Sequence, residues 1–558
     1  MQHLRGEFAC IIYDEPRQIF LAARDRYGIK PLFWTQQNGR LLLSAEMKGF
    51  LPLGWQPEWD VRSLKDAGWN CDQRTVFKGV QKIKPGHLLI CQSFGGVAEQ
   101  PYWDMSFPDK RTVNHITPEE AIEGVRERML HAIRLRLRAD VPVGIYLSGG
   151  IDSSVIAGMV EHLVRTEKLA MGSVNADSKI AAFSIAFNED SGFDESSIAN
   201  RTADWLGVKY YKKHMSEAEL AKRFEDAVWH CEHHNPDLNF VGKYALSEVP
   251  AEHGYKVVLT GEGADEHFGG YPTYLADFLR EPDHSWKAHN TLPEHLREAH
   301  FNKAEAEAKA YYESVGADSS TRGPSLARRM LNNISTVSSM AAFQPDLFSH
   351  WTNTAYGETD PQQTIATSHS PLTRQKIQHS WHPLHSAQYI WSKAHLTNIF
   401  LTCLGDRTEM AHSIEARTPL LDHELTSYVN TLPPSAKICY KPDEDRFVEK
   451  WLLREAAKPF ITRELYERKK HPYSAPTAFA KGGPLEELLA GLVTRGAVEG
   501  LGFVDWKRCE GLVGRAFGAE GEADPGAMRL LLVVAEWVVI GRRFGVKRAE
   551  PEGVVKGQ

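Results

Sequence analysis

The feature that most constrains the fold is the stretch VGIYLSGGIDSS at residues 143–154. An apolar run leads into a Ser-Gly-Gly turn, and residues 155–164 then repeat apolar side chains at helical spacing. Glycine tolerates positive φ and lets a ligand approach the backbone closely. The amide groups of such a turn, with the free N–H groups that open the helix, form an anion-binding site. The stretch therefore predicts a strand, a phosphate-binding turn and a helix of an α/β fold.

Hydroxyl and carboxyl groups surround this turn. Ser148, Ser153 and Ser154 supply hydroxyl donors, and Asp152 supplies a carboxylate suited to Mg2+. No Gly-Lys-Ser/Thr follows the glycines, so the turn is not a Walker A loop. SGGIDSS resembles the pyrophosphate-binding loop of the N-type ATP pyrophosphatases, which cleave ATP to AMP and pyrophosphate while adenylating an oxygen. A glycine turn that binds nothing is the alternative interpretation.

Composition sets the broad class of protein. A chain of 558 residues exceeds the roughly 250–300 at which single cores stop growing, so two domains are expected. The net charge of -7 argues against a general nucleic-acid binder. Seven cysteines without a C-x-x-C pair indicate a reduced, cytoplasmic protein. No apolar signal core opens the chain, and the apolar run 530–540 is too short for a membrane span, so no membrane partner is expected.

The first 105 residues indicate a β-rich unit. Four apolar runs separated by turn formers predict strands, at 8–13, 19–23, 41–44 and 87–91. Three segments resemble the later half of a class II glutamine amidotransferase domain, which is an N-terminal-nucleophile fold: RGEFA at 5–9, RDRYGIKPL at 24–32 and SAEMK at 44–48.

That resemblance implies a domain without its nucleophile. Class II amidotransferases open with a catalytic cysteine whose own amine serves as the base for its thiol. Here residue 2 is Gln2, Cys10 lies inside an apolar strand pattern, and the family's glutamine-binding segments have no counterpart. We therefore expect residues 1–105 to form a partial amidotransferase domain that lacks glutaminase activity, with Cys10 as a core residue.

Residues 115–545 are expected to form a second domain, after a polar linker at 107–116. A capping sequence at 117–120 predicts the start of a helix with three outward arginines, Arg134, Arg136 and Arg138. Strand and helix patterns then alternate through 180–213, which predicts a doubly wound parallel sheet with helical additions. In such sheets ligands bind beyond the carboxyl ends of the strands, where the 148–150 turn is expected to lie.

A second, acidic turn ends another predicted strand. The segment KVVLTGEGADE at 256–266 runs from β-branched residues into two glycines and three carboxylates. Acids this close repel one another without a counter-ion. Magnesium-pyrophosphate supplies one, so Asp152 and Asp265 are the expected Mg2+ ligands, and an exposed acidic turn is the alternative. With GGY at 269–271, the segment resembles the Ser-Gly-Glu-Gly-Ser-Asp-Glu…Gly-Gly-Tyr signature of asparagine synthetases.

The resemblance to asparagine synthetases assigns residues around the nucleotide. It implies that the Glu262 carboxylate is important for forming a β-aspartyl-AMP intermediate and is a candidate base toward ammonia. It also implies an ATP pocket made largely by backbone groups of Leu147, Ile185, Thr260 and Gly261. The same pocket would include the loop residues, namely Ser148, Gly149, Gly150, Asp152, Ser153 and Ser154.

Two later blocks extend the resemblance. LGDRTEMAHSIEARTPLLD at 404–422 resembles the family's Asp-Arg-x-x-Met-Ala…Glu-x-Arg-x-Pro signature and implies that Glu415 and Arg417 organise the acceptor pocket. A structural ion-pair network is the alternative there. KWLLREA at 450–456 and RKKHPY at 468–473 match two further family segments. Aligned this way, Lys470 is the cation that meets the phosphates and the charge that develops in adenylation, and a surface lysine is the alternative.

Two other stretches are expected to carry no chemistry. HCEHH at 230–234 suits a helix end better than a tetrahedral metal site, which needs separated ligand pairs. Residues 360–372 are polar and are expected to form a loop.

Together these features predict a ligase that resembles asparagine synthetases. ATP with Mg2+ would adenylate the side-chain carboxylate of aspartate, and ammonia, free or derived from glutamine, would displace AMP. The partners would be small-molecule substrates, without nucleic acid or membrane, and a homodimer is considered as the assembly. Three alternatives stay open: an amide ligase for another carboxylate, a tRNA thiolase of the same ATP-binding family, and a non-catalytic partner subunit.

Overall fold

The strand that leads into the 148–150 turn is the middle strand of a five-stranded parallel sheet. This computed structural model describes residues 1–558 apart from 174–178, 188–195, 288, 290–291, 315–325, 342–344, 469–474, 477, 519–521 and 552–558. Every pairing in the sheet is parallel. The strand order is β10 (Lys209–His214), β9 (Ala181–Ala186), β8 (Val143–Tyr146), β11 (Val257–Leu259) and β12 (Glu415–Arg417). The expected α/β class with a parallel sheet is confirmed.

Helices cover both faces of this sheet. Consecutive residues of β8 divide between two cores, because successive strand side chains point to opposite faces: Ile145 packs in one core and Tyr146 in the other. Burial on both faces explains why the three central strands, β9, β8 and β11, are largely apolar and buried throughout, whereas the edge strands β10 and β12 carry charged residues. The first core is shared with α3 (Pro118–Arg136), α4 (Ile151–Glu167) and α5 (Ser196–Leu206), and the second with α6 (Glu217–Cys231) and α7 (Asn239–Glu252).

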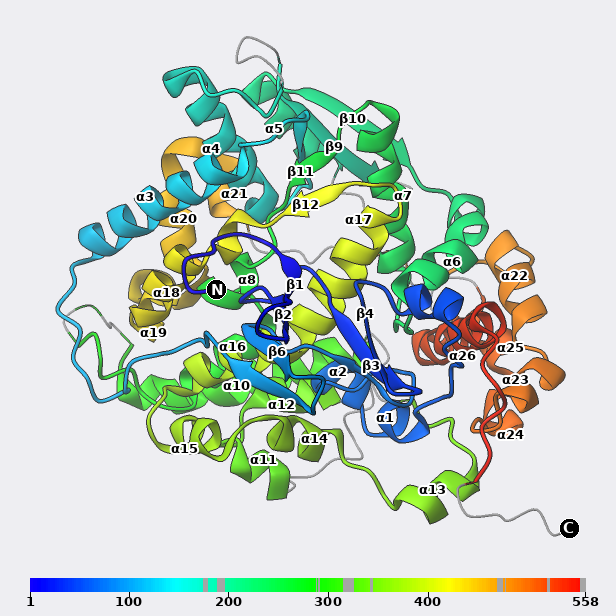
Figure 1. The fold of residues 1–558 in the computed structure, drawn as a ribbon. Helices are drawn as coiled ribbons and strands as arrows, with labels where there is room; N and C mark the ends of the chain where they lie inside the picture. The colour runs from blue at the N-terminus through cyan, green and yellow to red at the C-terminus, as the bar shows by residue number, and fades with distance from the viewer. Residues whose placement is uncertain are drawn as a thin grey trace, which may run out of the picture.

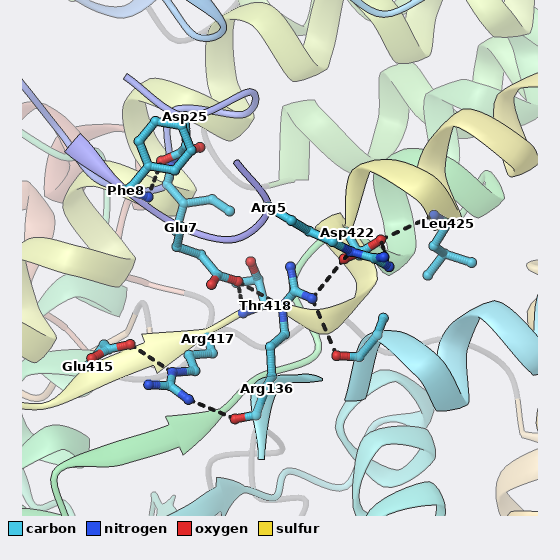
Figure 2. Close-up of polar contacts among 12 residues, drawn as sticks. Arg5, Glu7, Phe8, Asp25, Arg136, Glu415, Arg417, Thr418, Asp422 and Leu425 are labelled. Carbon is cyan, nitrogen blue, oxygen red and sulfur yellow. Dashed lines mark hydrogen bonds and ion pairs between the residues drawn. The ribbon is translucent and has the colours of Figure 1, made fainter. Parts of the chain in front are cut away.

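The helix predicted after residue 117 is present as α3. Its capping box is complete, because Thr117 Oγ1 accepts from the Glu120 amide at 3.2 Å and Glu120 Oε2 accepts from the Thr117 amide at 2.9 Å. The prediction that Arg136 points outward is wrong. Its guanidinium is buried and lies 2.9 Å from both Glu7 and Asp422 (Figure 2).

The N-terminal segment contains two small antiparallel sheets. The predicted strands are present, and the first of them, β1, is an edge strand with half-exposed side chains at Ile11 and Ile12. One sheet has the order β1 (Ala9–Asp14), β2 (Ile19–Arg24), β6 (His87–Gln92), β7 (Val97–Pro101), and the other β4 (Arg40–Ser44), β3 (Phe33–Gln37), β5 (Val80–Lys82). Short helices follow β4, namely η1 (Met47–Leu53), α1 (Val61–Lys65) and α2 (Gly68–Cys71).

This segment is packed tightly onto the rest of the chain. The Tyr27 hydroxyl donates to Thr426 Oγ1 at 2.7 Å, and Lys30 Nζ lies 2.8 Å from Asp406. Between the two parts, the predicted linker at 107–116 has no regular secondary structure, yet Phe107 is buried and stacks on His385. The division into 1–105 and 115–545 stays a prediction.

Most of the remaining chain is helical. The expectation of a loop at 360–372 is wrong, because Asp360 and Ser370 each cap a helix that has proline in its first turn. These two helices are α14 (Pro361–Ser368) and α15 (Pro371–His379). The other helices up to residue 410 are α8 (Ala264–Phe268), α9 (Pro272–Leu279), α10 (Glu294–Ser314), α11 (Leu326–Met330), α12 (Ser335–Ala341), α13 (His350–Tyr356), α16 (Pro383–Trp391), the π-helix Ser392–Arg407 and α17 (Thr408–Met410).

The last part of the chain ends in a long buried helix. That helix, α26 (Pro525–Phe544), contains the apolar run 530–540 and packs against α6 (Figure 1). Among the described residues no helix has the length and apolarity to cross a membrane. The elements before α26 are η4 (Pro419–Leu421), α18 (His423–Thr431), α19 (Pro434–Lys437), β13 (Ile438–Lys441), η5 (Pro442–Glu444), β14 (Arg446–Glu449), α20 (Trp451–Ala457), η6 (Lys458–Phe460), α21 (Arg463–Glu467), α22 (Pro484–Leu492), α23 (Arg495–Leu501), α24 (Trp506–Cys509) and α25 (Leu512–Ala516).

Candidate active site

The turns after β8 and β11 open into one cavity of about 1220 Å³. Its position at the carboxyl ends of parallel strands is the one expected for a ligand site in this kind of sheet. Most residues predicted for the nucleotide and the metal line it: Leu147, Ser148, Gly149, Gly150, Asp152, Ser153, Ile185, Thr260, Gly261, Glu262 and Asp265. Ser154 lies behind this wall, where its hydroxyl donates to Gly150 O at 2.8 Å.

Hydrogen bonds to serine hydroxyl groups fix the conformation of the turn at 148–150. Ser153 Oγ accepts from the Ser148 amide at 3.0 Å, and Ser148 Oγ accepts from the Gly150 amide at 3.2 Å. Gly261 of the second turn lies close against the first, because a Cβ there would come within 2.8 Å of the Asp152 carbonyl carbon. Glycine at 261 therefore lets the two turns meet.

A buried lysine joins the two predicted metal ligands. Lys450 Nζ lies 2.7 Å from both carboxylate oxygens of Asp152 and 2.7 Å from Asp265 Oδ1, and its side chain is 1% exposed. Burial opposes the charged form, but the adjacent carboxylates outweigh it and raise the pKa of Lys450. Gly270 makes room for this side chain, since a Cβ there would overlap Lys450 Cε.

Lys450 stands at the start of the KWLLREA segment, whereas the family resemblance predicts Lys470 as the cation at the phosphates. Lys470 lies outside the described residues. From the same later segment, Arg468 lines the cavity and donates to Gly149 O at 2.5 Å. A residue with positive φ outside glycine is uncommon, and Lys450 has a φ of 54° at the first position before α20. This strained backbone conformation places the Lys450 ammonium where the two turns meet.

The two aspartates fit an Mg2+ ion that arrives with phosphates. Asp152 and Asp265 carry two negative charges against the single charge of Lys450, and their side chains are 25% and 16% exposed. Mg2+ is commonly bound by one or two carboxylates together with substrate phosphates rather than by an all-protein cage. The described part of the chain has no cluster of three or more His, Cys, Asp or Glu side chains placed to hold a metal.

Glu262 faces the cavity beside a second lysine. Its carboxylate lies 3.2 Å from Lys243 Nζ of α7, and its side chain is 32% exposed. The third carboxyl group of the acidic turn belongs to Glu266 on α8. It is buried and accepts a hydrogen bond from the Tyr271 hydroxyl at 2.6 Å. Burial and the neighbouring Asp265 raise the pKa of Glu266 to about 7. Glu262 is thus more exposed to the cavity than Asp265, whose side chain is 16% exposed.

The pair predicted for the acceptor pocket lies elsewhere. Arg417 donates to Glu415 at 2.7 Å and to the carbonyl oxygen of Arg136 at 2.8 Å (Figure 2). It also donates to the carbonyl oxygen of Arg138 at 2.7 Å. Neither Glu415 nor Arg417 is among the residues that line the cavity. They tie the edge strand β12 to the end of α3, and the cavity wall is built from other residues.

Three elements far apart in sequence contribute walls that the sequence did not indicate. Trp69 from the N-terminal segment lines the cavity next to His234, with ring centroids 4.2 Å apart. Trp537 of α26 donates to His234 Nδ1 at 3.0 Å, and Arg529 of the same helix lines the cavity. The HCEHH stretch therefore packs against aromatic rings of both chain ends. No local sequence pattern could have brought these residues together.

Comparison with known proteins agrees with this geometry. The sequence profile described as asparagine synthase matches residues 124–539. The chain belongs to the asparagine synthase family. The profile of a glutamine amidotransferase domain matches residues 1–103.

Individual relatives in the asparagine synthase family differ in their names. "Amidase chyE" of Penicillium rubens is 47% identical over 550 residues, which are 98% of this chain and 81% of that protein. "Amidase chry2" of Gibberella zeae is 46% identical with the same coverage. "Asparagine synthetase [glutamine-hydrolyzing] 1" of Bacillus subtilis is 27% identical, across 85% of this chain and 68% of that protein.

Cys10 sits in the amidotransferase-like part on β1. Its thiol is half-buried, and burial raises its pKa. A thiol nucleophile needs a lowered pKa or an adjacent base. The environment of Cys10 therefore favours an inert side chain.

Proposed function

We propose that this chain is an ATP-dependent ligase that adenylates a carboxylic acid and transfers the acyl group to ammonia. The observation that carries the proposal is Lys450, held between Asp152 and Asp265 where the two turns meet. The backbone amides of a glycine-rich turn and a nearby cation suit the phosphates of a nucleoside triphosphate, and the two carboxylates suit its metal ion.

The residues of the cavity can support both steps. In the first, a carboxylate oxygen of the acid attacks the α-phosphorus of ATP, and the bond to pyrophosphate breaks with its electrons leaving on pyrophosphate. The backbone of the turn at 148–150, with Lys450 and Arg468, would bind the phosphates and stabilise the charge that develops on them. Asp152 and Asp265 would hold Mg2+, which would supply positive charge next to the pyrophosphate.

In the second step, ammonia attacks the acyl carbon and the bond to AMP breaks, with its electrons leaving on the phosphate oxygen. The extra proton on nitrogen passes to a base. Glu262 is the proposed base, because it faces the cavity and lies across the same turn from Asp265. In this chain Cys10 is not poised to release ammonia from glutamine, so ammonia itself is the proposed nitrogen donor.

Aspartate is the first acceptor to test, with asparagine as the product. A second acceptor class, a carboxylic acid larger than aspartate, is favoured by the cavity volume of about 1220 Å³ and by its aromatic wall at Trp69. The relatives at 46–47% identity are named amidases, whereas the asparagine synthetase is 27% identical, which also favours another acid. A homodimer and a cytoplasmic location stay predictions from the sequence.

The test follows AMP and pyrophosphate release from ATP and Mg2+ with aspartate or a panel of aromatic carboxylic acids. Each acid is combined with no nitrogen donor, with ammonium, or with glutamine. We expect AMP release that depends on one acid and on ammonium, and that glutamine does not support. Hydrolysis of ATP only to ADP, or no dependence on any acid, would refute adenylation of a carboxylate.

A further inference from the structure

The π-helix Ser392–Arg407 turns one set of side chains toward the cavity. His395, Ile399, Phe400 and Leu404 line the cavity, and the last three lie four, five and nine positions after the first. In an α-helix, at about 100° per residue, side chains nine positions apart point in nearly opposite directions. Hydrogen bonds of a π-helix reach one residue further, from i to i+5, so positions four, five and nine apart share one face. We call these four residues the π-helix face.

Threonine hydroxyl groups stabilise this winding. Thr397 Oγ1 donates to Ser392 O at 2.9 Å, and Thr402 Oγ1 donates to Thr397 O at 2.7 Å, so each bond spans five positions. Thr402 Oγ1 also accepts a hydrogen bond from Arg24 of the N-terminal segment at 3.3 Å. Because π-helical turns are rare and frequently occur at functional sites, a π-helix beside the cavity points to a role in binding.

The π-helix face is apolar and incompletely covered. Residues 394–398 and 401–403 of the helix are buried, whereas Ile399, Phe400 and Leu404 are only partly buried. Burial lowers the pKa of His395 to about 3, so its ring brings no charge at neutral pH. Large apolar side chains that stay partly uncovered on an otherwise buried helix, at the wall of a cavity, are typical of a ligand-binding surface.

Aromatic rings connect this face to the proposed metal site. The ring centroids of Phe400 and Tyr271 are 6.5 Å apart, and those of Tyr271 and Trp391 are 4.6 Å apart. All three rings line the cavity. The Tyr271 hydroxyl donates to Glu266, which directly follows the proposed metal ligand Asp265. An acid held at the magnesium-bound nucleotide would therefore have the π-helix face beside it.

We propose that the π-helix face binds the tail of the acid that is adenylated, and that this tail is uncharged and largely apolar. This inference rests on the proposed function. A charged group placed against an apolar surface costs free energy unless it is paired. Aspartate carries an ammonium and a second carboxylate beyond its reacting group, whereas a hydrocarbon tail would remove apolar surface of the face from water.

The experiment compares acids whose tails differ in charge. Exchange of labelled pyrophosphate into ATP is measured with aspartate, hexanoate or hydrocinnamate as the acid. Binding of hydrocinnamate without ATP is measured by saturation-transfer NMR, which does not require catalysis. The variants are Phe400→Ala, which removes a ring from the π-helix face, and Ile399→Lys, which adds a charge to it. Leu401→Ala is the matched control, because Leu401 is an apolar residue of the same helix that is buried and is not among the residues that line the cavity.

In the wild type we expect kcat/KM for exchange to be about tenfold or more higher with hexanoate or hydrocinnamate than with aspartate. Phe400→Ala should raise KM for hydrocinnamate about tenfold and leave kcat within about twofold, because the lost contact is equal in the ground state and the transition state. KM for aspartate should stay within about twofold in this variant. Ile399→Lys should lower kcat/KM for hydrocinnamate about tenfold or more, since an ammonium would face an apolar tail. Leu401→Ala should keep the wild-type preference among the acids.

A wild-type preference for aspartate, or equal changes of KM for aspartate and hydrocinnamate in Phe400→Ala, would overturn the inference while leaving adenylation intact. If Phe400→Ala fails to fold, unchanged kinetics with hydrocinnamate in Ile399→Lys gives the same negative result. Absence of exchange with every acid would remove the proposed function, and the NMR measurement then tests the π-helix face separately. Binding by the wild type that Phe400→Ala weakens would support the face, whereas no binding, or equal binding by both proteins, would overturn it.

Discussion

Replacement of Lys450 by methionine tests the central feature of the site. The substitution keeps the length of the side chain but removes an ammonium that is 1% exposed and contacts Asp152 and Asp265 at 2.7 Å. Removing one partner of a buried ion pair costs about 3–5 kcal/mol, because the other charge is left uncompensated. The aspartate side chains are 25% and 16% exposed, so the expected loss of stability is near the lower end, about 3 kcal/mol.

The same substitution should create a stronger divalent cation site. Two carboxylates without their ammonium attract Mg2+ more than the wild-type pair does, and a ligand at about 100 times its Kd stabilises the folded state by about 2.7 kcal/mol. Thermal unfolding should therefore show a lower Tm for Lys450→Met without Mg2+ and a larger Mg2+-dependent rise than in the wild type. Pyrophosphate exchange should fall about 100-fold or more, because the charge aimed at the phosphates is gone.

Lys437→Met is the matched control for this experiment. Lys437 is equally buried, but its ammonium donates to the amide oxygen of Gln388 at 2.9 Å, and burial lowers its pKa. Its replacement should leave the Mg2+ response and pyrophosphate exchange unchanged. Exchange within threefold of the wild type in Lys450→Met, or an Mg2+ response equal to that of the control, would refute the assignment of Lys450 and the two aspartates.

Two further predictions concern pH and stability. The Asp422 carboxyl is partly desolvated, but Arg5 and Arg136 outweigh this and lower its pKa to about 2, so its stabilising effect is complete above about pH 4 and is lost as pH falls toward 2. Asp422→Asn should lower Tm at pH 7, and the difference in Tm between the variant and the wild type should become smaller only below about pH 4. A difference in Tm that stays constant down to acid pH would contradict this. Burial raises the pKa of Glu536 well above its ordinary value. The contribution of Glu536 to the free energy of unfolding is therefore most favourable below about pH 4.3 and becomes less favourable as pH rises. Glu536→Gln, which can still accept from the Asn235 amide, should unfold at a higher temperature than the wild type at pH 8 and at the same temperature near pH 4; a variant less stable at pH 8 would contradict this.

Local sequence patterns predicted the parts of the fold that depend on neighbouring residues. The strand, turn and helix at 143–164 follow from an apolar run, two glycines and helical spacing, and the structure has all three. The start of α3 follows from a capping box within four residues. The prediction of a loop at 360–372 is wrong because Asp360-Pro361 and Ser370-Pro371 each start a helix, although the segment as a whole is polar.

The side-chain positions that could not be predicted from the sequence depend on contacts between residues far apart in the chain. Lys450 and Asp152 are 298 positions apart, and no spacing rule links them. Arg136 has the periodicity of an exposed helix face, yet Glu7 and Asp422 arrive from two other parts of the chain and bury it. Family resemblance named Glu415 and Arg417, but a motif does not reveal which side of a strand faces a cavity.

The packing of the two chain ends has a consequence for how this protein is made. Phe77 lies against Phe544 with ring centroids 4.8 Å apart, and Trp59 lies against Phe503 at 5.4 Å. A ribosome delivers these early aromatic residues long before Phe503 and before Phe544 at the end of the last helix, and domains generally fold as units during synthesis. The N-terminal segment must therefore wait, with apolar surface uncovered, until almost the whole chain has emerged. Truncation before α26 should leave that surface exposed and the product dependent on chaperones.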